Sequence, residues 1–245
     1  MDTIIQTQDL VKRFGGLVAV NGVNFTVERG EVRGLIGPNG SGKTTLINLI
    51  SGVYEPTAGK IFFDSVDITG WSPNRITQKG LMRTFQIPRL FGSMTLLENM
   101  LIPRFADFSL DYWRYRPAAE KHAQELLEMA GISHLRDQQA KTLSGGQKAL
   151  LQMARGFMVE EISVFLLDEP FAGVNIVVKD TIMELISKMA AEGITFILVS
   201  HEMASIRQMC QKVTVLAEGS VVTEGSMDEI AANKQVIDAY LGGGA

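Results

Sequence analysis

The sequence predicts an α/β fold with a mainly parallel core, an N-terminal antiparallel β part and an inserted helical lobe. Apolar runs of strand length alternate with helical segments after residue 161, which is typical of a parallel sheet covered on both faces. The strands near the N-terminus are joined by turns that leave no room for helices, so they should be antiparallel. Between residues 92 and 160 no strand-like run is obvious.

Glycine-rich turns separate the short elements of the N-terminal part. Strands are expected over residues 4–14, 18–27, 32–36, 60–63 and 81–86. A helix over residues 46–50 follows the third of these strands and ends before Gly52. Gln86 closes the last strand.

Capping residues mark the helices of the lobe. Thr95 precedes a helix over residues 96–102, and Ser144 precedes another helix with an apolar face. Pro117 is expected to open a helix that runs to residue 130, because proline fits the first turn of a helix.

Strands and helices alternate in the C-terminal part. Strands are expected over residues 162–167, 194–199, 213–216 and 221–222. Asn175 caps a helix that ends at Gly193, and shorter helices are expected over residues 204–210 and 235–241. We expect residues 1–245 to form one domain, with residues 1–91 and 161–245 as the core and residues 92–160 as the helical lobe.

Composition limits the classes of function. A chain of 245 residues with 46% apolar and 20% charged residues can bury a sizeable core. Its net charge of −4 gives no basic field for a nucleic-acid partner. The single Cys210 excludes an internal disulfide and suits a reducing cytoplasm. The first ten residues do not resemble a signal peptide, and the apolar runs are too short to span a membrane, so a membrane role would require a partner.

A glycine-rich loop joins the strand at residues 32–36 to the helix that follows it. The loop fits G-x-x-x-x-G-K-[ST] and consists of Gly37, Pro38, Asn39, Gly40, Ser41, Gly42, Lys43, Thr44 and Thr45. Glycines let successive N–H groups turn toward one point, and the helix N-terminus adds positive potential. Lys43 is expected to reach the β- and γ-phosphates of a nucleotide, and Thr44 to hold Mg²⁺. A plain glycine turn needs neither side chain, so the sequence predicts a phosphate-loop NTPase.

Two carboxylates follow the apolar strand at residues 162–167. Ligands of parallel sheets bind at the carboxyl ends of the strands, so Asp168 and Glu169 are expected beside the phosphate loop. We assign Asp168 to Mg²⁺, through water. Adjacent strand residues point in opposite directions, so Glu169 is the candidate that orients or deprotonates the attacking water. Alone, the two acids would also fit the solvent-exposed end of a strand.

A serine and two glycines at Ser144-Gly145-Gly146 open a second helix that could bind an anion, although an ordinary helix cap would explain them equally well in isolation. With Gln147 they complete the sequence Leu-Ser-Gly-Gly-Gln, the signature of the ATP-binding subunits of ABC transporters. With the phosphate loop and Asp168-Glu169 in matching order and spacing, the chain resembles this family over essentially its whole length. The resemblance implies a RecA-like core.

The resemblance also implies roles for the remaining site residues. Phe14 would stack on adenine, although it also fits as a core aromatic residue, and His201 would contact the γ-phosphate, although a lone histidine is more often structural. Gln86 would contact Mg²⁺ or the water, joining Thr44 and Asp168 as a metal ligand and Glu169 and His201 as a catalytic residue. The D-loop, which crosses the dimer interface, would comprise Gly173, Val174 and Asn175, with Asn175 in place of the usual aspartate.

The mechanism implied by the resemblance uses two cassettes packed head to tail, either identical or related chains. ATP would bind between the phosphate loop of one chain and a set of residues of the other: Ser144, Gly145, Gly146 and Gln147. Hydrolysis would drive membrane subunits, and a solute-binding protein would take part indirectly. The chain would then be peripheral, on the cytoplasmic face of the inner (plasma) membrane, and would bind no nucleic acid.

Several shorter segments are similar to importers of branched-chain amino acids: residues 12–20, 83–86, 94–99, 170–173 and 239–242. We therefore favour an importer of branched-chain amino acids or of related small amides or urea. Lipopolysaccharide-type exporters share residues 170–173 and the Tyr-Leu-Gly ending, so they are an alternative. A soluble, non-transport ABC ATPase is another, but the chain lacks the usual coiled-coil insertion or second cassette. A guanine-binding Asn-Lys-x-Asp motif is also missing, since Asn233-Lys234 is followed by Gln-Val.

Overall fold

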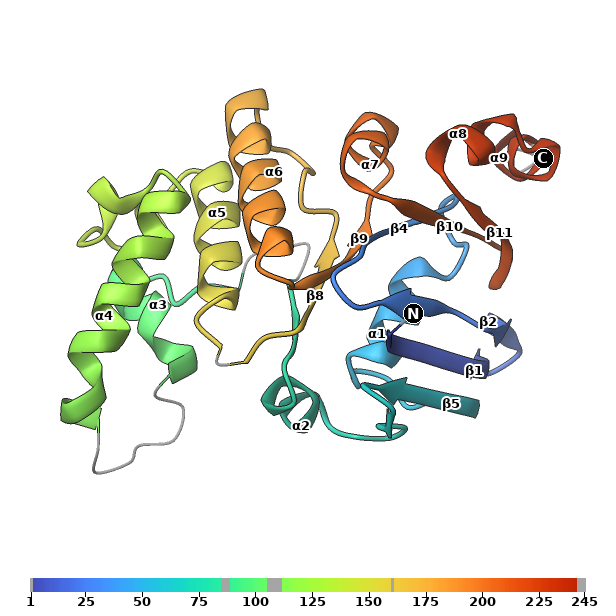
Figure 1. Cartoon of the computed structure of the whole chain (residues 1–245), viewed down its shortest axis with the longest axis horizontal. Helices are drawn as coiled ribbons and strands as arrows, with labels where there is room; N and C mark the ends of the chain where they lie inside the picture. Colours follow the sequence, from blue (N-terminus) through green and yellow to red (C-terminus); the bar gives the residue numbers. More distant parts are fainter. Residues whose placement is uncertain (1, 85–88, 105–111, 160, 242–245) are drawn as a thin grey trace.

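A computed structural model of the chain describes residues 2–84, 89–104, 112–159 and 161–241. Two β-sheets form the body of the molecule, and a group of helices lies at one end of it (Figure 1). The predicted α/β class is confirmed. Among the described residues, no helix combines the length and the apolar character that a membrane span requires.

The smaller sheet is antiparallel, as predicted, with the strand order β2-β1-β5-β6 and with β3 paired to β1. Its strands are β1 (Thr3–Phe14), β2 (Leu17–Val23), β3 (Thr26–Glu28), β5 (Ala58–Phe63) and β6 (Val66–Asp67). The strand predicted over residues 18–27 is divided into β2 and β3. Thr7 of β1 bridges the break, because its hydroxyl donates to the Val23 carbonyl at 2.8 Å and accepts from the Phe25 N–H at 2.9 Å.

The larger sheet has the order β11-β10-β4-β9-β8-β7 and is parallel except for the terminal β10–β11 hairpin. Its strands are β4 (Val32–Ile36), β7 (Leu81–Arg83), β8 (Val164–Asp168), β9 (Thr195–Val199), β10 (Lys212–Ala217) and β11 (Ser220–Gly225). The predicted strand over residues 81–86 ends as β7 at Arg83, and its last two residues lie outside the described ranges.

Helices outside the lobe follow the strands of the two sheets. They are α1 (Lys43–Ile50), α2 (Pro73–Gln78), α6 (Ile176–Ala191), α7 (Met203–Met209), α8 (Met227–Ala232) and α9 (Lys234–Leu241). Asn175 caps α6 as predicted, since its side chain accepts from the Val178 N–H at 3.0 Å. The sequence analysis missed α2 and α8, although α8 begins with a capping box between Ser226 and Glu229.

Three helices form the end of the molecule where the lobe was predicted: α3 (Leu96–Leu101), α4 (Tyr112–Met129) and α5 (Gly145–Gly156) (Figure 1). Thr95 and Ser144 cap α3 and α5, each through a capping box. The expected start of α4 at Pro117 is wrong, because the helix already begins at Tyr112 and runs through the proline. The proline ring keeps a helical φ, but its nitrogen cannot donate the hydrogen bond that this position would otherwise make.

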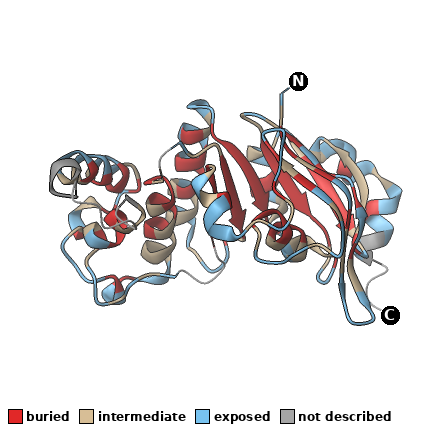
Figure 2. Ribbon diagram, turned by 90° about the horizontal axis from the view of Figure 1, so that it is seen from below, coloured by how far each residue is buried: buried red, intermediate tan, exposed pale blue. Residues whose placement is uncertain are grey.

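Two hydrophobic clusters hold these parts together, and Figure 2 shows the buried strands at the centre of both sheets. Helix α1 shares one cluster with the antiparallel sheet and with one face of the parallel sheet, so it packs between the sheets. The other face of the parallel sheet forms a single cluster with the lobe helices, α6 and α7. Neighbouring residues of β8, such as Leu166 and Leu167, belong to opposite clusters, as the alternation of side chains along a strand requires. The boundary of the lobe as a separate unit stays a prediction.

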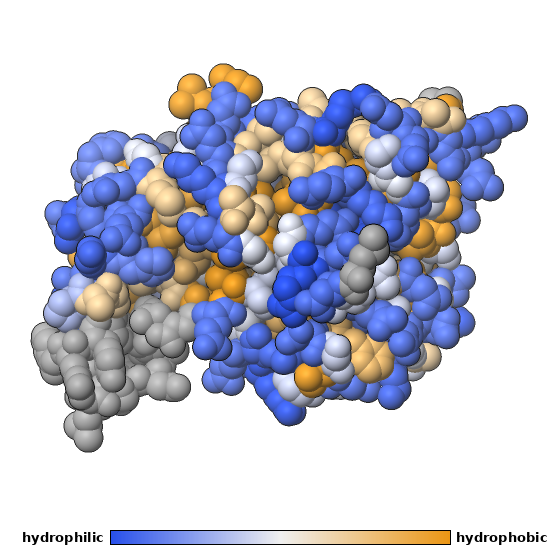
Figure 3. Space-filling view, viewed as in Figure 1, coloured by the Kyte–Doolittle hydropathy of each residue, from blue (hydrophilic) through white to orange (hydrophobic). Residues whose placement is uncertain are grey.

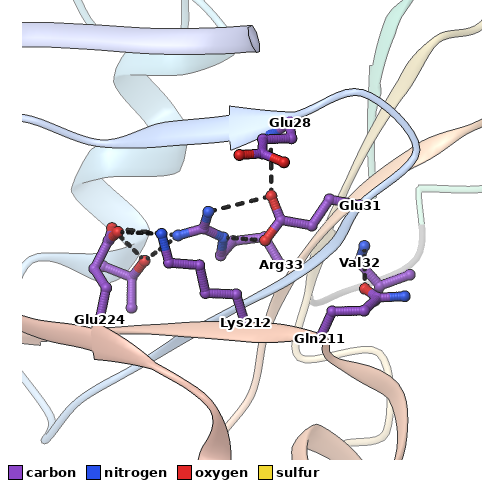
Figure 4. A network of polar contacts seen from close by, with 8 residues as sticks. Glu28, Glu31, Val32, Arg33, Gln211, Lys212 and Glu224 are labelled. Carbon is purple, nitrogen blue, oxygen red and sulfur yellow. Dashed lines mark hydrogen bonds and ion pairs between the residues drawn. The ribbon is translucent and has the colours of Figure 1, made fainter. Parts of the chain in front are cut away.

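A buried arginine connects β4 to the terminal hairpin (Figure 4). Arg33 is only 1% exposed, and its guanidinium donates to both carboxylate oxygens of Glu31 at 2.6 and 3.1 Å. It also lies 3.3 Å from Glu224 of β11, which Lys212 of β10 contacts at 3.0 Å. A buried charge is tolerated when it is paired and hydrogen-bonded, so this network fixes the strand that leads to the phosphate loop.

We expect Arg33→Leu to lower the free energy of unfolding by about 3–5 kcal/mol, because Glu31 and Glu224 would lose a shared buried cation. Urea unfolding followed by circular dichroism would measure the loss. Arg29→Leu is the matched control, since Arg29 pairs at the surface with Asp2 and Asp64 and should cost about 1 kcal/mol or less. Equal losses in the two variants would contradict the role assigned to the network.

Candidate functional site

The carboxyl ends of the parallel strands open into a cavity of about 740 Å³. Its walls bring together segments that lie far apart in the sequence. The predicted site residues that line it are Phe14, Asn39, Gly40, Ser41, Gly42, Lys43, Thr44, Thr45, Asp168, Glu169 and His201. The fold therefore places most of the residues predicted for nucleotide binding and catalysis around one space.

The phosphate loop runs from the end of β4 to the start of α1. Gly40 and Gly42 have φ angles of 79° and 100°, a left-handed backbone that glycine adopts readily. No side chain caps α1, so the N–H groups of its first turn remain available to an anion. The Lys43 ammonium donates to the carbonyls of Gly37 and Pro38 at 2.7 and 2.9 Å, which holds it across the loop. Burial lowers the pKa of Lys43, and the negative charges of Glu169 and Asp168 oppose that shift.

Two other segments contact the phosphate loop, and the sequence analysis predicted neither contact. A Cβ on Gly42 would lie 2.4 Å from the carbonyl oxygen of Ala19 in β2. The Gly219 N–H, in the turn between β10 and β11, donates to the Ser41 carbonyl at 3.1 Å. The strands predicted over residues 213–216 and 221–222 leave a turn at Gly219, but no local signal shows that this turn contacts the phosphate loop.

Asp168 ends β8 and is 7% exposed. Arg83 of β7 donates to its carboxylate at 3.1 Å, and the Asp168 N–H donates to the Thr84 hydroxyl at 3.3 Å. Burial raises the pKa of the Asp168 carboxyl, while the charge and hydrogen bond of Arg83 oppose that shift. The sequence analysis included Arg83 only within residues 83–86, a segment similar to the importers. Its pairing with Asp168 depends on the register between β7 and β8.

Glu169 and His201 meet in the wall of the cavity. The Glu169 carboxylate lies 2.9 Å from Nδ1 of His201, and its side chain is 15% exposed. Glu169 has a φ of 52°, and its N–H donates to the Val199 carbonyl at 2.9 Å, which turns the side chain out of the strand direction. A non-glycine residue in this conformation is strained, and such strain is concentrated at functional sites.

Phe14 lines the cavity at the end of β1, and 42% of its surface is exposed. It is therefore not the core aromatic residue that the sequence left as an alternative. Tyr54 packs against it edge-on, with 5.3 Å between the ring centroids, and the Lys12 ammonium lies 5.1 Å from its ring centre. A partly exposed ring held in this way can stack on a planar base.

The residues predicted to act on a second chain do not line this cavity. Ser144 and Gly145 are exposed at the N-terminus of α5, and the Ser144 hydroxyl accepts from the Gln147 N–H at 3.3 Å. Packing also requires a glycine at position 146, because a Cβ there would lie 2.8 Å from the Val178 side chain of α6. Gly173 and Val174 line smaller crevices beside Glu169, and Gln86 lies outside the described residues.

The donors present in the cavity suit Mg²⁺. Thr44 and Asp168 both line it, and hydroxyl and carboxylate oxygens are the ligands that this ion prefers. Within the described ranges, no group of three or more His, Cys, Asp or Glu residues could hold a metal ion by itself. These two protein ligands fit an ion whose remaining ligands come from water and phosphate oxygens.

Comparisons with known proteins agree with this geometry. A family model described as "ABC transporter" matches residues 20–172, and one described as "Branched-chain amino acid ATP-binding cassette transporter" matches residues 220–245. A probable branched-chain amino acid transport ATP-binding protein, LivG, of Archaeoglobus fulgidus is 40% identical over 98% of this chain and 95% of its own. The high-affinity branched-chain amino acid transport ATP-binding protein BraF of Pseudomonas aeruginosa is 36% identical over 98% of both chains.

Solved structures give the same result. The ADP conformation of an ATP-binding cassette of an ABC transporter is 33% identical, covers 99% of this chain and 100% of its own, and superposes with a TM-score of 0.87. A dimeric cassette in a post-hydrolysis state, bound to ADP and Pi, is 25% identical over 91% of this chain and 99% of its own, with a TM-score of 0.79. The predicted phosphate-loop NTPase fold is confirmed.

We expect Gly42→Ala to weaken ADP binding at least about tenfold and to lower the melting temperature, because its methyl group would collide with the Ala19 carbonyl in a left-handed backbone. Isothermal titration calorimetry and thermal unfolding would measure the two effects. Gly40→Ala is the control, because Gly40 has a similar left-handed backbone but no atom within 4 Å of a Cβ. In this variant only the backbone strain of about 1 kcal/mol remains. Equal binding by the two variants would show that the close approach is unimportant.

Proposed function

This chain belongs to the ABC transporter family, and we propose that it is the ATP-hydrolysing subunit of an importer of branched-chain amino acids. The observation that carries the proposal is the single cavity shared by the phosphate loop, Asp168 and the Glu169–His201 pair. The family model over residues 220–245 and the names of the relatives support the class of solute. The chain itself contributes the energy-converting step, and the proposal assigns it no direct contact with the solute.

In this proposal the triphosphate lies along the phosphate loop, where the N–H groups at the start of α1 face its oxygens. The Lys43 ammonium, which bonds two loop carbonyls, would exchange those bonds for the β- and γ-phosphates. Phe14, which also lines the cavity, would stack on the adenine ring. Catalysis in this class of reaction is mainly positioning and electrostatic stabilisation.

Glu169 is the group that would orient the attacking water and take its proton, because its carboxylate is held by His201 and lines the cavity. The side chain of His201 is 74% exposed, and it would contact the γ-phosphate. Thr44 and Asp168 would hold Mg²⁺, and Gln86 is proposed as a further ligand. When bound, Mg²⁺ neutralises charge that develops on the phosphate oxygens.

Cassettes of this family work as dimers with membrane subunits, and a related cassette has been solved as a dimer. We propose that two cassettes pack head to tail, with Ser144, Gly145, Gly146 and Gln147 of one facing the nucleotide of the other. Their position outside the cavity of their own chain, at an exposed helix N-terminus, supports this arrangement. The proposed location is peripheral, on the cytoplasmic face of the inner membrane, with a solute-binding protein acting on the other side.

Glu169→Gln should lower kcat for ATP hydrolysis at least about 100-fold while ATP still binds, because the amide cannot accept a proton from water. A phosphate-release assay and equilibrium ATP binding would separate the two effects. Glu161→Gln is the control: Glu161 is exposed and has a similar φ of 54°, so it tests the substitution in the same backbone conformation away from the cavity. Wild-type turnover in Glu169→Gln would rule out the proposed mechanism.

Affinity purification of the chain from detergent-solubilised membranes should recover integral membrane subunits of a branched-chain amino acid transporter, identified by mass spectrometry. Uptake of radiolabelled leucine by cells that lack the chain should fall and should be restored by wild type but not by Glu169→Gln. Recovery of ribosomes or DNA without membrane proteins would favour a soluble, non-transport ATPase. Normal leucine uptake with loss of lipopolysaccharide export would favour the exporter alternative.

A further inference from the structure

The His201 side chain lies between two open spaces. It lines the nucleotide cavity, and it also lines a groove of about 410 Å³ that begins beside Glu169. The side chain is 74% exposed, and its Nδ1 atom lies 2.9 Å from the Glu169 carboxylate. Packing alone does not fix a ring with open space on both sides, so the position of this imidazole depends on the backbone that carries it.

The residues on either side of His201 are held by different contacts. Ser200 follows β9 and is 1% exposed, and its hydroxyl accepts from the Glu202 N–H at 3.0 Å. Glu202 precedes α7, but its side chain caps no backbone N–H of that helix. Its carboxylate accepts instead from the Ser205 hydroxyl at 3.1 Å and from the Lys179 ammonium of α6. The loop that carries His201 is therefore tied to α6.

Lys179 lies at the end of the first turn of α6. This part of the helix contributes nothing to the core, because none of residues 176–181 is buried and Ile182 is the first residue of α6 that is. Figure 3 shows this end of α6 protruding at the top of the view. The Lys179 side chain is nevertheless only 17% exposed where it meets Glu202. Its ion pair thus joins an end of α6 that has little packing of its own to the loop after β9.

Both members of this ion pair line the groove, and neither lines the nucleotide cavity. The hydrogen bond from Lys179 is the main reason why the pKa of the Glu202 carboxyl is lowered, so the carboxylate stays ionised and paired near neutral pH. Glu169 and His201 border both spaces, and only His201 adjoins Glu202 in the chain. A change at Lys179 would therefore reach the nucleotide through His201.

We propose that Lys179 is a positioning residue for His201. Its ion pair with Glu202 fixes the loop after β9, so that the imidazole keeps its contact with Glu169 and its place beside the γ-phosphate. The inference rests on the proposed function, which gives His201 its contact with that phosphate. It assigns Lys179 itself no contact with the nucleotide.

The first test measures ATP hydrolysis by the full chain. Lys179→Met should lower kcat at least about fivefold and leave the KM for ATP within about twofold, because a misplaced catalytic group weakens the transition state more than nucleotide binding. Lys179→Arg keeps a positive charge and a hydrogen-bond donor, so its kcat should stay within about twofold of wild type. Arg207→Met is the matched control and should not change kcat, since Arg207 joins α7 to Asp228 of α8 and lines neither space.

A double-mutant cycle shows whether Lys179 acts through His201. His201→Ala should lower kcat at least as much as Lys179→Met does, and adding Lys179→Met to His201→Ala should change kcat less than about twofold. A lysine that acted in another way would lower kcat by the same factor in both backgrounds. The melting temperature of Lys179→Met should stay within about 4 °C of wild type, because a partly exposed ion pair contributes little to stability.

The second test observes the imidazole directly by NMR, without nucleotide. The chain has three histidines, so the ring-nitrogen signals of His201 can be assigned from the spectrum of His201→Ala. These signals should shift or broaden in Lys179→Met and should match wild type in Lys179→Arg. The signals of His122 and His134 are internal controls and should stay in place in both variants.

Failure of the inference and failure of the proposed function give different results. Wild-type kcat and unmoved His201 signals in Lys179→Met would overturn the inference and leave the proposed function intact. An equal loss of kcat in the wild-type and His201→Ala backgrounds would also overturn it, because Lys179 would then act by another route. Wild-type kcat in His201→Ala would instead overturn the role that the proposed function gives to His201, and the inference with it.

Discussion

The organisation of this molecule depends on the close approach of three backbone segments at the phosphate loop. A Cβ on Gly37 would lie 2.1 Å from the Leu216 carbonyl, and one on Gly42 would lie 2.4 Å from the Ala19 carbonyl. Leu216 belongs to the parallel sheet and Ala19 to the antiparallel one, so the loop is held where the two sheets meet. The glycines therefore do more than free the backbone to bind phosphate, because they also allow the two sheets to converge on the site.

Two cations and a carboxylate balance their charges at the site. Lys43, Arg83 and Asp168 are all largely removed from water, and burial acts against the charged form of each: it lowers the pKa of the two cations and raises that of the carboxyl. Their mutual attraction opposes these shifts. Arg83 also donates to Asn48 of α1 and to Ser51, the residue that follows the helix, so it links the helix after the phosphate loop to the carboxylate at the end of β8. Position and charge of Asp168 are therefore set by the same contact.

Local signals in the sequence predicted most of what local physics determines. The phosphate loop with the strand before it, and the caps at Thr95, Ser144 and Asn175, follow from neighbouring residues, and the structure has them. The contacts of Arg83 and Gly219 depend on strand register and on a hairpin more than 170 residues from the loop, so no local pattern contains them. The break between β2 and β3 is an error of the same kind, because the Thr7 side chain that bridges it belongs to another strand. The roles of Ser144 and Gln86 stay predictions.

The contact between Gly146 and Val178 has a mechanical consequence. With only a hydrogen at position 146, the start of α5 packs against Val178 of α6 at a distance that leaves no room for a methyl group. A bulkier side chain at position 146 would therefore push the start of α5 away from α6 and shift the exposed residues Ser144 and Gly145 relative to the core.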